Sequence, residues 1–230
     1  MRNHRPRRLI QRGLIQRGLI LRALILCTCL AVTNVHGAPL TRAEALEAIA
    51  QPDASARLAG VERLGEIGRM PDAQRLLVRL ADTDEKVRGY AVAAMWQIWS
   101  RSGDPAIDKL FARGLEQMQT MAFKEALATL NTIVQRKPEF AEAWNKRATL
   151  YFLMGEFDKS LKDCDEVLKR NKHHFGAMSG AGQIHMQLGN PKKALEFFRR
   201  AVDVNPNLDG PAQMIPLLEQ HLRDKGQNTT

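Results

Sequence analysis

A period of 34 residues in the second half of the chain constrains the fold more than any other feature of the sequence. Small residues recur at this spacing in two columns of one register. The first column is Gly114, Ala148 and Gly182, and the second is Ala126, Ser160 and Ala194. A repeat of this length fits a pair of short helices, and a small residue on each helix lets the two backbones approach closely. The sequence therefore predicts stacked helical hairpins.

Each repeat contains a turn and leaves one apolar face. Gly155 and Gly189 share the column between the two helices of their units, and Pro206 ends the last helix of the series. Trp144 and Tyr151 are two helical turns apart and mark the apolar face of a first helix. Because a hairpin with one apolar face must bury it on a neighbour, the pattern predicts an all-α repeat fold.

These residues resemble the tetratricopeptide repeat family. The resemblance divides this half of the chain into three units, 107–140, 141–174 and 175–208. Four positions depart from the motif. Lys172 replaces the closing Pro of the second unit, Met121 replaces the turn Gly of the first, and Gln117 and His185 stand in the column of Tyr151. The family implies a right-handed helical-repeat solenoid, all-α in class.

The resemblance also implies a binding site, because in this family the inner face of each first helix lines a concave groove that holds a peptide. Carried over by register, that face is Asp108, Phe111, Leu115, Met118, Glu142, Asn145, Thr149, Phe152, Gly176, Ser179, Gln183 and Met186. Asn145 is expected to be its most exposed polar residue, able to pair with a peptide backbone. The alternative for Phe111, Leu115 or Phe152 is burial between neighbouring helices.

The same face indicates which ligands the groove would not take. Family members that clamp the acidic C-termini of chaperones use Lys, Arg and Asn here. This chain has Phe111, Leu115, Ser179 and Gly180 instead. An acidic tail is therefore not the expected ligand.

Residues 38–106 show a weaker repetition. The segment 53–57 aligns with the segment 84–88 at a spacing of 31, and each begins with Asp and ends with Arg. An Asp at a helix start accepts hydrogen bonds from free backbone amides, and an Arg one turn later can reach a neighbouring Asp. The pattern resembles a pair of short HEAT-type repeats, with Asp72 and Asp104 near the starts of the second helices.

Both ends of the repeats have a candidate closing helix. Thr41 and Glu44 have the spacing of a capping box and predict a lead helix. Residues 209–230 predict a capping helix followed by a frayed tail, with Pro216 disturbing its first turns.

Trp96 and Trp99 lie one helical turn apart in a segment that is apolar nearly all round. Such a segment is central rather than exposed. We expect the two rings to join the HEAT-like part to the tetratricopeptide part; a ligand-binding aromatic patch is the alternative.

Residues able to support catalysis are scarce. His173 and His174 are expected on a solvated turn, since no Cys or carboxylate stands at metal-ligand spacing from them. His185 and Cys164 share columns with packing residues, so we expect both to be buried. The sequence predicts no enzyme, no metal site and no cofactor.

The net charge of +9 comes mostly from the first 37 residues. That stretch has seven Arg and no Asp or Glu, and the rest of the chain has 27 basic against 25 acidic residues. A near-neutral body argues against a nucleic-acid partner. An Arg-rich start, the apolar run 23–32 and small residues at Gly37 and Ala38 form the pattern of a secretory signal peptide, residues 1–37.

Export follows from that pattern. Cleavage is expected between Gly37 and Ala38, which would leave no stable membrane insertion and a periplasmic or secreted protein. An uncleaved start or an organelle transit peptide is the alternative. The sequence thus predicts a non-catalytic cell-envelope adaptor that binds another protein. The alternative is a permanent structural subunit or assembly factor of an envelope assembly that uses the HEAT-like surface.

Overall fold

The computed structural model describes residues 38–227, so the expected signal peptide lies outside the described residues. In this range the chain forms eleven α-helices, one short 3₁₀ helix and no strand, which confirms the all-α prediction. The first half contains α1 (Arg42–Ala48), α2 (Ala54–Ile67), α3 (Met70–Leu76), η1 (Leu77–Ala81) and α4 (Glu85–Trp99). The second half contains α5 (Pro105–Gln119), α6 (Phe123–Arg136), α7 (Ala141–Leu153), α8 (Phe157–Arg170), α9 (Phe175–Gln187), α10 (Pro191–Val204) and α11 (Asp209–Gln227).

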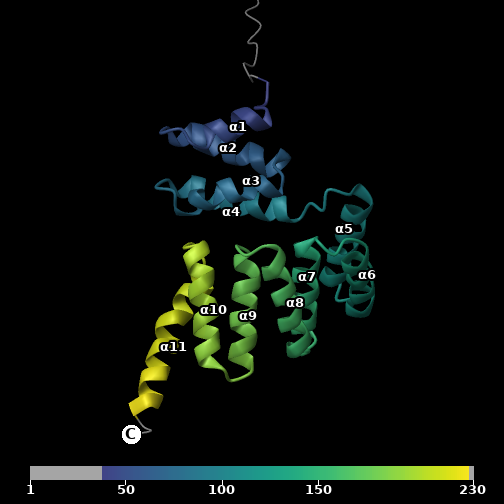
Figure 1. Ribbon diagram of the computed structural model, residues 1–230, viewed down its shortest axis with the longest axis vertical. Helices are drawn as coiled ribbons and strands as arrows, with labels where there is room; N and C mark the ends of the chain where they lie inside the picture. The colour runs from purple at the N-terminus through teal and green to yellow at the C-terminus, as the bar shows by residue number, and fades with distance from the viewer. Residues whose placement is uncertain (1–37, 228–230) are drawn as a thin grey trace, which may run out of the picture. The chain divides into compact units, whose positions relative to one another are not determined.

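The helices from α5 to α10 form three hairpins, each made of two consecutive helices packed side by side (Figure 1). The three hairpins follow the period of the sequence, because Ala126, Ala194 and Ser160 lie buried at equivalent places on their second helices. A helical-repeat arrangement therefore results from the small-residue columns.

The turn between the two helices has a left-handed residue in every hairpin. Gly155 has a φ of 76° and Gly189 a φ of 68°. Met121 occupies the same column and also has a positive φ, 57°. The first hairpin thus keeps the turn of the other two although its sequence lacks the glycine that adopts this conformation without steric cost.

The small residues of the first helices do not all meet their partner helix equally closely. A Cβ atom at Gly182 would lie 2.5 Å from the ring of Phe198, which is buried on α10. A Cβ atom at Gly114 would lie 3.5 Å from Thr129, an ordinary contact distance. Glycine is therefore required at Gly182 but not at Gly114.

In the first half, the expected helix starts are present. Asp53 caps α2 and Asp84 caps α4, and Thr41 with Glu44 forms a capping box at α1. Arg57 pairs with Asp82 at 2.8 Å, and both side chains are nearly buried. Burial alone would destabilise this pair, but two parallel hydrogen bonds from the guanidinium compensate.

The second HEAT-like copy differs from the prediction. Asp104 does open a helix, but that helix is α5, which packs against α6 in the first hairpin of the second half. The copy that begins at Asp84 therefore has no second helix of its own. Asp72 does lie in the first turn of α3, where it accepts a hydrogen bond from the backbone N–H of Arg69 at 2.7 Å.

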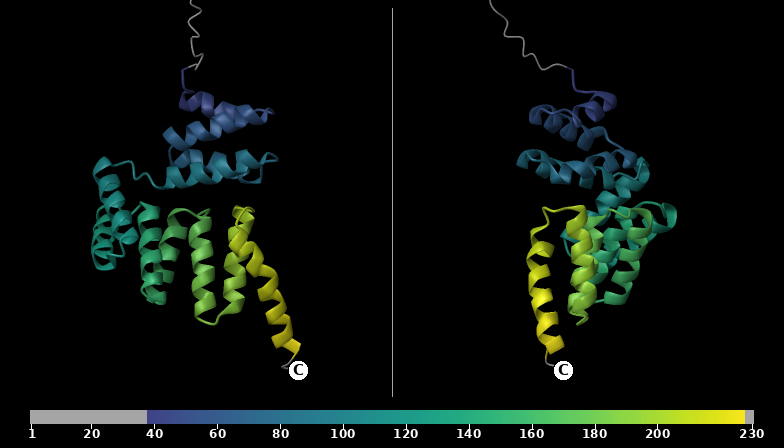
Figure 2. Two further views of the ribbon diagram at one scale, coloured as in Figure 1. Left: turned by 180° about the vertical axis from the view of Figure 1, so that it is seen from behind. Right: turned by 60° about the vertical axis from the view of Figure 1, so that its left-hand side comes forward.

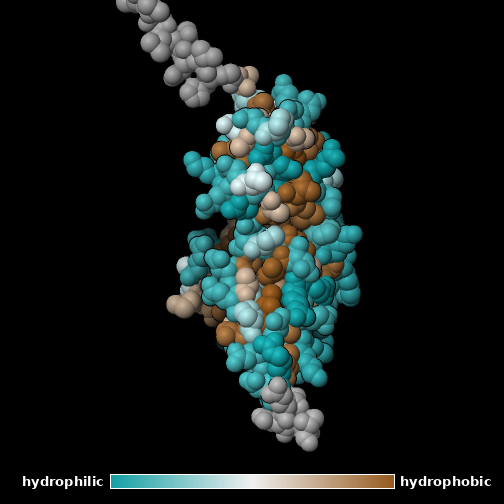
Figure 3. All heavy atoms as spheres, turned by 90° about the vertical axis from the view of Figure 1, so that its left-hand side faces the viewer, coloured by the Kyte–Doolittle hydropathy of each residue, from teal (hydrophilic) through white to brown (hydrophobic). Residues whose placement is uncertain are grey.

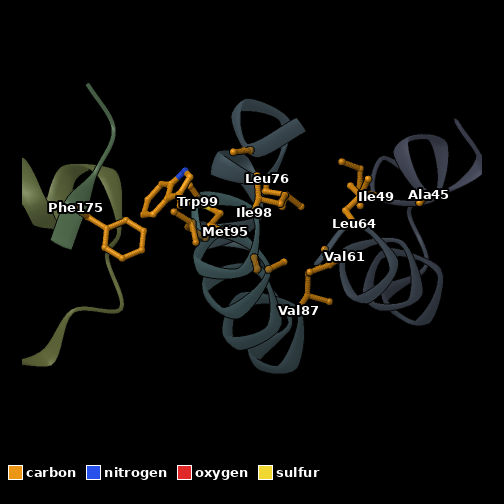
Figure 4. Packing of buried hydrophobic residues seen from close by; sticks show 14 residues of the cluster. Ala45, Ile49, Val61, Leu64, Leu76, Val87, Met95, Ile98, Trp99 and Phe175 are labelled. Atoms are coloured by element: carbon orange, nitrogen blue, oxygen red, sulfur yellow. The ribbon is translucent and has the colours of Figure 1, made fainter. Parts of the chain in front are cut away.

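The helices α1 to α4 lie across one end of the hairpins (Figures 1 and 2). The contact is hydrophobic. Trp99 of α4 lies next to Phe175 at the start of α9 (Figure 4), and Trp96 of α4 packs against the same cluster. Asn207 adds a hydrogen bond from its Nδ2 to the backbone oxygen of Leu80, at 2.6 Å. The two tryptophans therefore join the two halves of the chain, as expected from the sequence.

The helix α11 covers α10 at the C-terminal side. Met214, Ile215 and Leu222 pack around Leu218, which is buried against Phe198 and its neighbours. Figure 3 shows this side, where hydrophobic side chains follow a narrow band between hydrophilic flanks. Pro216 is accommodated inside the helix. Within residues 38–227, no helix has both the length and the apolar character needed to cross a bilayer.

Two alanine substitutions test the packing of the hairpins. Gly182→Ala should lower the free energy of unfolding by about 1–3 kcal/mol, because its new methyl group collides with the buried Phe198 ring. Gly114→Ala, in the same column, should raise it by up to about 1 kcal/mol, because alanine favours a helix and space is available. Urea denaturation measures both values. A shift of both midpoints in the same direction would contradict the close approach of α9 to α10.

A second pair of variants tests the left-handed turn. Met121→Gly should raise the free energy of unfolding by about 0.5–1 kcal/mol. It removes the steric cost of a left-handed residue, roughly 1–2 kcal/mol, and this gain exceeds the stabilisation of the unfolded chain by the extra backbone entropy of glycine. Gly155→Ala should lower it by a similar amount, since nothing lies within 4 Å of the new Cβ and only the backbone is strained. Thermal unfolding of the two variants gives the comparison. Destabilisation by Met121→Gly would contradict the assigned turn.

Candidate peptide-binding groove

The predicted groove residues come from three first helices, α5, α7 and α9, and the structure places them in different environments. The helices α7 and α9 lie next to each other and contact directly, as do α5 and α7. The predicted residues lie in three environments: an open surface, the core and the contact with α4.

The residues Asn145, Thr149, Phe152 and Gln183 meet around a hollow of about 70 Å³ between α7 and α9. Thr149 and Gln183 are exposed, and Phe152 is half-buried with its ring against Phe157, at 5.7 Å between centroids. No side chain lies within 4 Å of the place where Gly180 would carry a Cβ. This part of the predicted groove is therefore open, with an aromatic wall and a bare stretch of main chain.

Asn145 is not the exposed residue that the sequence indicated. Its side chain is 7% exposed, and its Nδ2 donates to the two carboxylate oxygens of Glu142 at 3.2 and 3.1 Å. Its backbone oxygen accepts from the hydroxyl of Thr149. The prediction of exposure was wrong because Glu142, one helical turn earlier, already binds the amide.

Glu142 is itself buried, at 1% exposure, and does not line an open surface. It receives hydrogen bonds from His174 at 2.9 Å and from Lys146 at 3.0 Å in addition to that of Asn145. Burial favours the protonated form of this carboxyl group, but the bond from His174 and the charge of Lys146 outweigh it. The pKa of Glu142 consequently lies below its ordinary value.

His174 was expected on a solvated turn, and the structure corrects that expectation. The ring is fully buried and stacks on Trp99, with 4.5 Å between ring centroids. Its Nδ1 accepts a hydrogen bond from the backbone N–H of Ala177 at 3.0 Å and so caps α9. The proton of the ring therefore sits on Nε2 and is donated to Glu142.

The helix α4 closes one end of the groove. A Cβ atom at Gly176 would lie 2.5 Å from Cη2 of Trp96, so the indole packs directly on the backbone of α9. The ammonium of Lys146 lies 5.6 Å from the centre of the same ring, within the range of a cation–π contact. The groove is thus bounded by Trp96 and open toward Thr149 and Gln183.

The remaining predicted residues lie elsewhere. Phe111 is buried against Phe140, with ring centroids 5.0 Å apart, and Leu115 and Met118 pack partly against the same cluster. The carboxylate of Asp108 accepts the backbone N–H of Ser102 at 2.7 Å, in the connection between α4 and α5. The structure therefore does not bring this α5 set into the open hollow, and burial is the correct alternative for Phe111.

On α9, two more predicted residues are only partly accessible. Ser179 is half-buried, and its hydroxyl has no hydrogen-bond partner within residues 38–227. Met186 packs with the cluster that joins α10 to α11. Neither residue borders the hollow between α7 and α9.

The other candidate reactive groups are structural. Cys164 is 3% exposed, and burial raises the pKa of its thiol to about 12, so the reactive thiolate is not formed near neutral pH. His185 is buried and stacks on Phe197 at 5.5 Å. Both expectations of burial are confirmed. In the described part of the chain, no three His, Cys, Asp or Glu residues are grouped so that they could hold a metal ion.

Two of the hairpins match a known repeat family. Residues 141–174 and 176–208 match models of the tetratricopeptide repeat. A tetratricopeptide repeat-containing protein of Rhizobium etli is 33% identical over 124 residues, which cover 54% of this chain and 61% of the relative. Hsp70-Hsp90 organizing protein 1 of Glycine max is 26% identical over 112 residues, which cover 46% of this chain and 20% of the relative.

Among solved structures, the Sgt2 TPR domain of Aspergillus fumigatus is similar with a TM-score of 0.51 and 17% identity, covering 55% of this chain and 85% of that domain. The chain spans less than two thirds of the length of the two relatives above. The two matched segments coincide with the second and third hairpins, and the fold similarity extends over about half of the chain. The chain therefore contains tetratricopeptide repeats.

Proposed function

We propose that the protein is a non-catalytic adaptor that binds a peptide segment of another protein on the open face between α7 and α9. The observation that carries the proposal is the hollow where Thr149, Phe152 and Gln183 converge beside the bare backbone of Gly180. One relative is named as organising Hsp70 and Hsp90, which supports a role in bringing proteins together.

The chemistry of the hollow favours an uncharged peptide. Phe152 offers an apolar contact, and Gln183 offers an amide with no hydrogen-bond partner of its own in residues 38–227. No Lys, Arg or His lines the hollow, and Lys146 on α7 is paired with Glu142 at 3.0 Å. A ligand that relies on carboxylates would gain little here, so we infer an apolar side chain flanked by peptide groups that bond to Gln183.

We also propose that the adaptor works in the cell envelope, as a periplasmic or secreted protein. This part rests on the Arg-rich start, the apolar run and the small residues at Gly37 and Ala38.

A permanent structural subunit or assembly factor of an envelope assembly is the second candidate. Large hydrophobic side chains on the HEAT-like half favour it, since Val78 is 63% exposed and Tyr90 is 46% exposed. A partner that copurifies at constant stoichiometry would indicate the subunit, and variable, salt-labile partners would indicate the adaptor.

The groove is tested by photo-crosslinking and by a double substitution. A photo-crosslinking amino acid at Gln183 should capture a discrete partner, and Thr149→Arg with Gln183→Arg should then weaken binding of the crosslinked partner segment about tenfold or more, since two long side chains fill the hollow. Fluorescence anisotropy of that labelled segment measures the affinity. The helical circular-dichroism signal should not change, because both replaced residues are exposed.

A chemically matched control is available on α6. Thr132→Arg with Gln135→Arg changes the same residue types at two exposed positions outside the groove. It should leave the affinity within about twofold of the wild-type value. Equal loss of binding in the two double variants would contradict the assignment of the groove as the binding site.

The location is tested by the N-terminus of the protein purified from its source. The mature chain should begin at Ala38 and be found outside the cytoplasm, because the signal peptide would be removed during export. Mass spectrometry of the N-terminal peptide and cell fractionation give both results. A stable cytosolic protein that keeps residues 1–37 would contradict export.

A further inference from the structure

A cleft of about 410 Å³ lies where the α3–α4 region meets the connection between α8 and α9. It is separate from the groove, since none of its lining residues borders the hollow between α7 and α9. A neighbouring hollow of about 100 Å³ shares Met70, Trp99 and Asn171 with it. The volume of the cleft alone is within the range of ligand-binding pockets, roughly 300–1,000 Å³.

The floor of the cleft is apolar. Leu77, Met95 and Trp99 line it from α4 and the segment before it, and Met70 lies at its edge with 43% of its surface exposed. An exposed methionine beside an aromatic ring adapts its shape to different apolar side chains. The floor therefore fits one large apolar side chain of a ligand.

The rim is basic. Lys169, Arg170, Lys172 and His173 line the cleft, and no Asp or Glu is among its lining residues. Glu139 lines the neighbouring hollow, where Lys137 pairs with it at 3.0 Å. Lys169 and Arg170 share the single carboxylate of Glu166, at 2.6 and 2.5 Å. Lys172 is exposed and forms no ion pair with any residue in 38–227. The rim thus retains excess positive charge.

Part of the rim is held in place before any ligand arrives. The guanidinium of Arg170 lies 4.6 Å from the centre of the Trp144 ring and donates to the backbone oxygen of Pro138. The oxygen of the Asn171 side chain accepts the backbone N–H of His173, and its Nδ2 has no acceptor in the described part of the chain. An amide donor without a partner is unfavourable, and a ligand oxygen would satisfy it.

We propose that this cleft is a second binding site, for an acidic peptide segment of a partner protein. One large apolar side chain of that segment occupies the floor between Met70 and Trp99, and its carboxylates face Lys169 and Lys172. Charge complementarity selects an acidic segment, because the rim carries cations that the Thr149–Gln183 hollow lacks. The proposal does not depend on peptide binding in the groove between α7 and α9.

The probe for this site is the blocked peptide Glu-Asp-Glu-Leu-Phe-Asp-Glu-Glu, titrated into the full-length chain labelled with ¹³C at its methionine methyl groups. Met70 and Met95 line the cleft, whereas Met118 and Met186 lie outside it, so the methionine NMR signals report whether the probe binds in the cleft. The Met70 and Met95 signals should shift in a saturable manner, while Met118 and Met186, on helices α5 and α9, should not. A peptide with Gly-Ser in place of Leu-Phe should bind more weakly, since it leaves the floor empty.

Charge-matched variants separate a specific rim from general attraction. Lys169→Glu with Lys172→Glu should weaken probe binding about tenfold or more, because it reverses the charge beside the bound carboxylates. Lys192→Glu with Lys193→Glu makes the same change in net charge at exposed positions of α10, and it should change the affinity less than about twofold.

Four results would overturn the proposal. They are equal weakening in both double variants, shifts at Met118 or Met186 instead of Met70 and Met95, and the absence of saturable binding. The fourth is a Met70 signal that moves with protein concentration without probe, together with a dimer in sedimentation, because a second copy of the chain would then occupy the cleft.

Discussion

The aromatic junction between α4 and the start of α9 is the contact on which both candidate sites depend. Trp96 packs on the backbone at Gly176 and so bounds the groove, while Trp99 stacks on His174 and forms part of the floor of the cleft. Ring pairs of this kind contribute roughly 0.5–1.5 kcal/mol each beyond the burial of their surface. Trp96 and Trp99, one helical turn apart on the same face of α4, therefore determine where the groove ends and where the cleft begins.

A buried polar network lies directly under this junction. A carboxylate taken out of water is unfavourable unless it is fully hydrogen-bonded. Glu142 meets that condition with Asn145, Lys146 and His174, and the His174 ring uses its other nitrogen to cap α9. The network thus fixes the orientation of α7 relative to α9, and it engages the Asn145 amide and the Glu142 carboxylate in internal hydrogen bonds.

The parts of the fold that follow from local spacing could be predicted from the sequence. The columns of Gly182 and Ala194 gave the hairpins, and their register correctly placed Thr149, Phe152 and Gln183 on one surface. The sequence could not show that His174 stacks on Trp99, because the two residues are 75 positions apart in the chain. The prediction that Asn145 is exposed was wrong for a related reason. Its spacing from Glu142 allows the hydrogen bond between them, but the pair is buried only because His174 and α4 pack over it. Asp104 was correctly placed at a helix start and assigned to the wrong hairpin, because capping is local and helix pairing is not.

The position of α4 has a consequence for the order in which the chain folds. Each hairpin closes through contacts between neighbouring segments, which form quickly, whereas the helical segment 42–99 contacts residues far along the sequence, such as Phe175 and Asn207. The hydrogen bond from Asn207 to Leu80 spans 127 residues. The helices α1 to α4 precede the third hairpin in the sequence, so the face of Trp96 and Trp99 stays uncovered until that hairpin exists. Until that hairpin forms, the nascent chain exposes an aromatic surface to other molecules.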